Sequence, residues 1–146
     1  MHLRDVMRKR VAIVSPDTLL REAAHKMNIL GLSLLPVCEG SIVVGLLTIR
    51  DIAVRATAQG CDPRVTRVRE VMSAPTIYGQ EDQSPKEAVD LMERWSLYRL
   101  PVLDQRMHLV GIVSLSDLCG DFARSMRRSS RTHRQRPIPN GRRSTC

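Results

Sequence analysis

The sequence predicts an α+β protein made of two copies of one β-α-β-β-α unit. The heptapeptide "GLLTIRD" at residues 45–51 returns as "GIVSLSD" at residues 111–117, with Gly, two aliphatic residues, a hydroxyl residue and Asp at the same spacing. A shift of 65 residues also places Leu-Pro-Val of residues 35–37 on residues 100–102. Ordered self-similarity of this kind is typical of a duplicated unit.

The first two elements of each unit are a short extended segment, at 11–14 or 76–78, and an amphipathic helix. In the second copy the helix start is explicit, because Ser84 to Glu87 form a capping-box pattern with Pro at the first helical position. The expected apolar face of this helix consists of Ala88, Leu91, Met92 and Trp95.

The first copy lacks the capping serine. Thr18 or Asp17 is therefore expected to cap its helix, and Gly31 suits the helix end. The expected apolar face of this helix consists of Leu20, Ala23, Ala24, Met27 and Leu30.

A β-hairpin and a second helix complete each unit. The first strand contains a proline, which favours a strand end or a sheet edge. The second strand is rich in β-branched residues. In the first copy the strands are expected at 34–38 and 41–48, the turn at 39–40 and the helix at 49–59. In the second copy the strands are expected at 99–103 and 108–114, the turn at 104–106 and the helix at 115–125.

These elements divide the chain into a first unit at 3–60, a linker at 61–68 and a second unit at 69–123. Gly60 and Pro63 mark the end of the first unit. A unit of about 55 residues buries too little surface to be stable alone. We therefore expect the two units to pack face to face about a pseudo-twofold axis.

The net charge of +8 is concentrated in residues 124–146. This tail holds eight of the 23 basic residues and no acid, so the rest of the chain has 15 basic and 15 acidic residues. It lacks aromatics and regular apolar spacing, and we expect it to be disordered. It is either a mobile terminus or a weak electrostatic arm for nucleic acid or another polyanion.

Several function classes are disfavoured by what the sequence lacks. The four cysteines and four histidines are scattered, without the close spacing of a metal or redox motif. Nucleophile-elbow, P-loop and dinucleotide-binding motifs are absent, so we expect no enzyme, no metal and no required cofactor. Without a long apolar run or a leader, the expected location is the cytoplasm, with no membrane contact.

The repeated heptapeptide lies where the last strand passes into the second helix. Thr48 and Ser114 take the N-cap position, and Asp51 and Asp117 follow three residues later. One interpretation is a reciprocal helix cap. The other is a ribose-phosphate site, because a carboxylate accepts hydrogen bonds from a vicinal diol while a hydroxyl and free backbone N–H groups suit phosphate. Gly45 and Gly111 would allow close approach of neighbouring backbone.

The paired units, the Leu-Pro-Val strands and the repeated Gly-to-Asp motif resemble a tandem CBS-domain pair, the Bateman module named from cystathionine β-synthase. The similarity covers about residues 3–123, and the stretch "LTIRDIAVRATAQGCDP" is similar to stand-alone bacterial CBS pairs such as the hypoxic response protein group. The resemblance implies a regulatory module that binds AMP, ADP, ATP, NAD or S-adenosylmethionine between its units. It also implies a homodimer that signals to an effector protein, which the sequence does not identify.

By this resemblance Asp51 and Asp117 hold ribose, while Thr48 and Ser114 contact ribose or phosphate. Apolar side chains near the first and second strands are implied as the adenine lining. In one site these are Ala12, Ile13, Leu35 and Pro36; in the other they are Ile77, Tyr78, Leu100 and Pro101.

The two sites differ in their arginines. Arg50 precedes Asp51 where the second copy has Ser116, and Arg99 precedes Leu100 where the first copy has Leu34. Arg99 would contact phosphate or base, and Arg50 would contact phosphate; the alternative for each is a solvated arginine or a surface ion pair. We expect one site to bind better than the other. A ligand-free dimeric scaffold, and polyanion binding by the tail, are the alternative functions.

Overall fold

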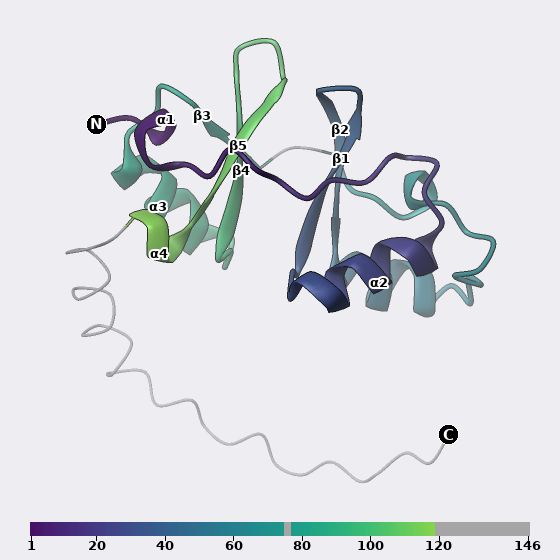
Figure 1. Ribbon diagram of the computed structural model, residues 1–146. Coiled ribbons are helices and arrows are strands. Elements are labelled where there is room, and N and C mark those ends of the chain that lie inside the picture. The colour runs from purple at the N-terminus through teal and green to yellow at the C-terminus, as the bar shows by residue number, and fades with distance from the viewer. Residues whose placement is uncertain (75–76, 119–146) are drawn as a thin grey trace, which may run out of the picture.

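The computed structural model describes residues 1–74 and 77–118, which form two β-hairpins with helices packed beside each (Figure 1). Both hairpins are antiparallel, and the predicted α+β class is confirmed. The strands are β1 (Leu34–Glu39), β2 (Ile42–Thr48), β3 (Gly79–Gln80), β4 (Arg99–Leu103) and β5 (Leu109–Ser114). The helices are α1 (Leu3–Val6), α2 (Leu20–Leu30), α3 (Pro85–Arg94), α4 (Leu115–Leu118), the π-helix η1 (Asp51–Thr57) and the 3₁₀ turn η2 (Val68–Glu70).

The two long helices begin in different ways. Ser84 caps α3 as predicted: its hydroxyl accepts from the Glu87 N–H, and its own N–H donates to the Glu87 carboxylate at 2.9 Å. The predicted cap of α2 by Thr18 or Asp17 is wrong, because Leu19 takes the N-cap position without a side-chain bond. Backbone carbonyls of the segment between the two units, Thr66 and Pro63, instead accept from the first N–H groups of α2 at 2.8 and 3.0 Å.

The burial predicted for the apolar faces of α2 and α3 is confirmed along most of each helix and is wrong at its C-terminal end. Leu30 and Trp95 are exposed, because the helices end there and turn toward β1 and β4. Val89, which the spacing rule did not select, is buried in the second unit. Gly31 ends α2 in the left-handed conformation, as expected.

Three predicted elements differ in detail. The helix expected at 49–59 is wound as a π-helix from Asp51 to Thr57. Of residues 11–14, Val14 alone bridges β1. In the second unit β3 lies at Gly79–Gln80, directly after the extended segment expected at 76–78, whose first residue is outside the described part of the chain. Pro36 and Pro101 lie within β1 and β4 and not at a strand end. The alternative prediction, a sheet edge, is confirmed for β1, which belongs to a two-stranded sheet, and is wrong for β4, which is the middle strand of three. The Pro36 carbonyl accepts from Val14, so its ring nitrogen also faces away from β2 and removes no bond of the hairpin.

Each unit takes part of its core from the segment that precedes the other unit. Leu3 is fully buried in the cluster of the second unit, with Leu100 and Met92. Val68 and Val71 are buried in the cluster of the first unit, with Leu35. Figure 1 shows the N-terminal chain lying beside β3 before it crosses to α2. The unit boundaries stay a prediction, but the packing units exchange their first segments.

The exchanged segments cross the hairpins at equivalent places. Arg8 bridges Ile112 of β5 through two backbone hydrogen bonds of 2.9 Å, and Ser73 bridges Leu46 of β2 in the same way. A Cβ on Gly45 would lie 2.5 Å from the Met72 sulfur and 3.1 Å from the Ser73 carbonyl oxygen. Gly111 meets Met7 and Arg8 similarly. Because Gly45 and Gly111 have no side chain, the neighbouring backbone can approach each hairpin closely, as predicted from the sequence.

The two units meet through their hairpins. Cys38, Val43 and Leu46 of the first hairpin share a buried cluster with Leu103 of the second. The Val43 N–H also donates to the Met107 carbonyl at 3.1 Å, next to the hairpin turn. This shared core links the two units through both side chains and backbone.

The crossing predicts the effect of adding one methyl group. Gly45→Ala should lower the free energy of unfolding by about 1–3 kcal/mol, because its Cβ would overlap Met72 and crowd the Ser73 backbone. Urea unfolding measures this loss. The double variant with Met72→Ala should lose less than the sum of the two single variants. An unchanged unfolding midpoint for Gly45→Ala would contradict the close crossing.

Candidate functional site

The first repeated motif forms a reciprocal cap over the helical residues 49–50, which lead into η1. The Thr48 N–H and hydroxyl donate to Asp51 Oδ2 at 2.9 and 3.0 Å, and the Asp51 N–H donates to Thr48 Oγ1 at 3.1 Å. The second motif repeats this geometry: the Ser114 N–H donates to Asp117 Oδ2 at 3.0 Å, and the Asp117 N–H donates to Ser114 Oγ at 3.2 Å. The capping interpretation is confirmed at both motifs.

The other carboxylate oxygen of each aspartate is held by the exchanged segment. Ser73 Oγ donates to Asp51 Oδ1 at 2.9 Å. Arg8 donates to Asp117 Oδ1 from Nη2 at 3.1 Å and from Nε at 3.3 Å. Neither Ser73 nor Arg8 was predicted as a site residue. The repeat contained the signal, because a shift of 65 aligns Val-Met-Arg8 with Val-Met-Ser73.

The two carboxylates have different surroundings. Asp51 is buried, and its Oδ1 lies 3.8 Å from Arg55 Nε. The Asp117 side chain is 16% exposed and pairs with Arg8, which is 71% exposed. Partial burial by itself would raise the pKa of Asp117. The hydrogen bonds from Ser114 and Arg8, with the Arg8 charge, outweigh that effect and lower the pKa below its usual value.

Strand pairing decides which predicted lining residues share a face with the motif hydroxyls. Pro36 is two residues from Leu34, which lies opposite Thr48, so these three side chains point to one face. Leu35 points to the opposite face. It is fully buried in the core of the first unit, as Leu100 is in the core of the second. These two leucines therefore offer no surface to a ligand.

The second hairpin follows the same register. Arg99 lies opposite Ser114, and Pro101 shares their face. Arg99 thus occupies the place that Leu34 takes beside Thr48. Ile13 and Tyr78 are half-buried against the core shared by the two units. The remaining predicted residues are Ala12 and Ile77, which pack on the unit cores, and Arg50, which is exposed.

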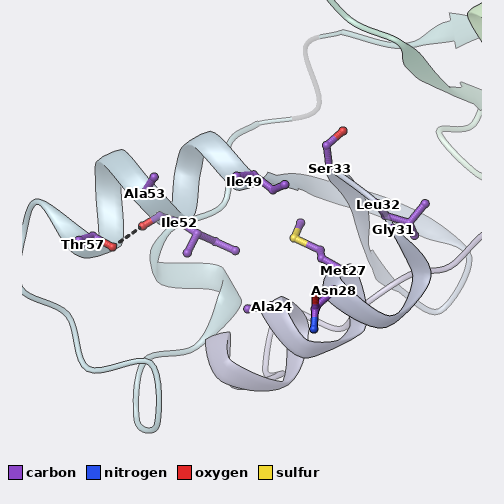
Figure 2. Close-up of a pocket in the computed structure, with 10 residues that line it drawn as sticks. All are labelled: Ala24, Met27, Asn28, Gly31, Leu32, Ser33, Ile49, Ile52, Ala53 and Thr57. Carbon is purple, nitrogen blue, oxygen red and sulfur yellow. Dashed lines mark hydrogen bonds between the residues drawn. The ribbon is translucent and has the colours of Figure 1, made fainter. Parts of the chain in front are cut away.

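A separate hollow of about 560 Å³ lies between α2 and η1. Figure 2 shows Met27 of α2 and Ile52 of η1 among its lining, with Ile49 just before η1. It contains none of the predicted ligand residues, and its lining has no charged side chain that could hold a phosphate. We therefore place the candidate ligand site at the two carboxylates.

Within residues 1–74 and 77–118, no three His, Cys, Asp or Glu side chains gather in a way that could hold a metal ion. Cys38 and Cys61 are free thiols. No helix in that same part of the chain is long and apolar enough to cross a membrane. The tail at 124–146, expected to be disordered and basic, lies outside the described residues.

Two stretches, residues 3–56 and 68–124, match the family model of the CBS domain. The chain belongs to the CBS-domain family. The two matches correspond to the repeat, so this is a CBS pair. The similarity inferred from the motifs is confirmed.

Relatives of similar length include the CBS domain-containing protein YhcV of Bacillus subtilis, which is 44% identical over 116 residues, covering 80% of this chain and 81% of YhcV. Hypoxic response protein 1 of Mycobacterium tuberculosis is 32% identical, covering 79% and 80%. The inosine-5'-monophosphate dehydrogenase of Methanocaldococcus jannaschii is also 32% identical, but the match covers only 22% of that enzyme.

Two solved structures have the same fold. Hypoxic Response Protein I, which has two coordinated zinc ions, superposes with a TM-score of 0.73 at 30% identity, covering 83% of this chain and 98% of that one. The CBS domain pair of protein MJ0100 was solved in complex with 5'-methylthioadenosine and S-adenosyl-L-methionine. Its TM-score is 0.70 at 25% identity, covering 86% and 98%.

The lowered pKa of Asp117 predicts a pH-dependent stability. Because its pKa is lower in the folded state, the ionised carboxylate stabilises the fold above the usual value of 3.8, and this contribution is lost as pH falls through the lowered pKa. Asp117→Asn should therefore be less stable than wild type near pH 7, by about 1 kcal/mol or less. The difference should shrink near pH 3, measured by urea unfolding.

The control for this prediction is Asp90→Asn, which changes an exposed carboxylate on α3. It should show no comparable pH-dependent loss. An equal stability difference between wild type and Asp117→Asn at both pH values would contradict the assigned interactions of Asp117.

Proposed function

We propose that this CBS pair is a regulatory module that binds adenosine-containing ligands at Asp51 and Asp117. The proposal rests on the different roles of the two oxygens in each carboxylate. Oδ2 accepts from the backbone N–H of the motif hydroxyl residue, so it maintains the helix cap. Oδ1 is held by the side chain of Ser73 or Arg8. A ribose diol can replace that side chain without breaking the cap.

The residues around each carboxylate suit the rest of such a ligand. Thr48 and Ser114 supply hydroxyl groups beside the carboxylates, for ribose or phosphate. Pro36 and Pro101 are apolar and lie on the same sheet faces as these hydroxyls, and both are buried in the absence of ligand. Ala12, Ile13, Ile77 and Tyr78 remain proposed lining residues. Leu35 and Leu100 are left out because they point to the opposite sheet face and are fully buried in the unit cores.

The adenosyl ligands bound by the MJ0100 pair support the ligand class. AMP, ADP, ATP, NAD and S-adenosylmethionine all carry the required ribose diol. We propose no catalysis and no required cofactor, because the motif side chains are engaged in caps and ligand contacts. The proposed location is the cytoplasm, where thiols such as Cys38 and Cys61 stay reduced.

Signalling would follow from the shared core of the two hairpins. Leu103 of β4 packs with Cys38 and Leu46 of the first hairpin, and Ser73 and Arg8 connect the crossing segments to the motif carboxylates. A ligand that displaces either side chain changes the contacts between a crossing segment and a hairpin. Differential affinity for the two arrangements would shift their populations, and an effector protein would respond to the change.

The binding proposal predicts the effect of removing the carboxylate charge. Asp51→Asn combined with Asp117→Asn should weaken binding by about 10- to 150-fold, because a desolvated hydrogen bond to a charged group is worth about 1.5–3 kcal/mol. Isothermal titration with AMP, ATP, NAD and S-adenosylmethionine measures the affinity. Asp90→Asn is the matched control and should bind as wild type does. If wild type binds none of these ligands at high micromolar concentration, the proposal fails.

We also propose that the protein forms homodimers through the helices of the first unit. Ile29 and Leu30 on α2, with Ile49 and Val54 on the neighbouring segment 49–57, are exposed apolar side chains. Exposed apolar side chains next to an apolar hollow favour contact with another protein surface, here a second copy. The same surface would serve a ligand-free scaffold, so self-association alone does not distinguish the two functions.

Analytical ultracentrifugation tests the dimer. Val54→Glu should shift the protein toward monomer, because it places a charge in the proposed contact. Val65→Glu is the matched control, since Val65 is also exposed, at 71% against 54% for Val54, but lies in the segment between the units. Equal dissociation constants for both variants and wild type would contradict this surface.

A further inference from the structure

The two proposed sites differ most at the residue that the crossing segment presents to each aspartate. Arg8 and Ser73 are equivalent in the repeat, and each forms the same pair of backbone bonds with a hairpin. Both reach Oδ1 of a motif aspartate. The first site therefore has a neutral hydroxyl where the second has a guanidinium.

The Arg8 guanidinium donates to Asp117 Oδ1, the oxygen atom to which a ribose diol would bind. Nη2 and Nε both point at Asp117 Oδ1, at 3.1 and 3.3 Å. A neutral nucleoside that takes Oδ1 must break this ion pair and leaves the guanidinium without its carboxylate. In the first site the diol displaces one neutral hydroxyl of Ser73, which water readily solvates.

Arg8 can move when a better partner arrives. Its side chain is 71% exposed, and exposed ion pairs of this kind contribute little to stability. A phosphate accepts two parallel bonds from a guanidinium, which is stronger and more directional than the present contact to one oxygen. A phosphorylated ligand thus offers Asp117 a diol and Arg8 an anion.

A second cation, Arg99, lies on the sheet face of the second site. Arg99 lies opposite Ser114 on one sheet face, where the first site has Leu34. The first site has Arg55 close to Asp51, but its Nη1 donates to the Met72 carbonyl at 3.1 Å. The second site therefore has one guanidinium on Asp117 and a second opposite Ser114, while Arg55 of the first site is bonded to the main chain.

We propose that Arg8 makes the second site selective for phosphorylated adenosine ligands, by leaving Asp117 for the ligand phosphate. This inference rests on the proposed binding of adenosine-containing ligands. The first site, with Ser73 in the equivalent position, discriminates less between a nucleoside and its phosphate.

The test compares AMP with adenosine by isothermal titration. The Asp51→Asn background disables the first site, and in it AMP should bind at least about tenfold more tightly than adenosine. Adding Arg8→Ser, which copies Ser73, should bring the two affinities to within about threefold. Arg8→Lys keeps the charge and should retain part of the preference. Arg10→Ser, which removes an exposed charge two residues away, should leave it unchanged.

The reverse exchange gives an independent result. In the Asp117→Asn background, Ser73→Arg should introduce a preference for AMP into the first site. If AMP and adenosine bind but Arg8→Ser leaves their ratio unchanged, the role of Arg8 is overturned while the proposed function stands. If neither ligand binds wild type or any variant, the proposed function fails, and this inference fails with it.

Discussion

The rest of the structure depends on the close crossing of the chain over each hairpin at Gly45 and Gly111. A side chain at either glycine would overlap the thioether of Met72 or Met7 and crowd the backbone behind it. The crossings place Leu3 in one core and Val68 in the other. Each unit therefore needs a segment from the chain before its neighbour, which explains why units of this size occur as a pair.

The same crossings build the candidate sites. Each brings one side chain, Arg8 or Ser73, to Oδ1 of a motif aspartate, while Oδ2 of the same aspartate caps a helix. A structural role and a binding role can therefore coexist in one carboxylate. The cap orients the group in the absence of ligand, and preorganisation of this kind reduces the cost of binding.

The pseudo-symmetry of the pair holds for the backbone and fails for the charges. Both crossings use two backbone bonds of equal length, and both hairpins have the same register around the motif. The substitutions between copies change a hydroxyl to a guanidinium and a leucine to Arg99. Duplicated sites on one scaffold can in this way acquire different ligand preferences without a change of fold, since such preference lies in site residues.

Local patterns in the sequence determined the repeat, both hairpins, the Ser84 cap and the reciprocal caps of Thr48–Asp51 and Ser114–Asp117. These features join residues a few positions apart, where spacing alone decides which groups can meet. Tertiary structure decided the carbonyl cap of α2, the exchange of segments, the burial of Leu35 and Leu100, and the Arg8–Asp117 contact. Arg8 and Asp117 are 109 residues apart in the chain, so only the packing of the crossing segment against β5 brings them together.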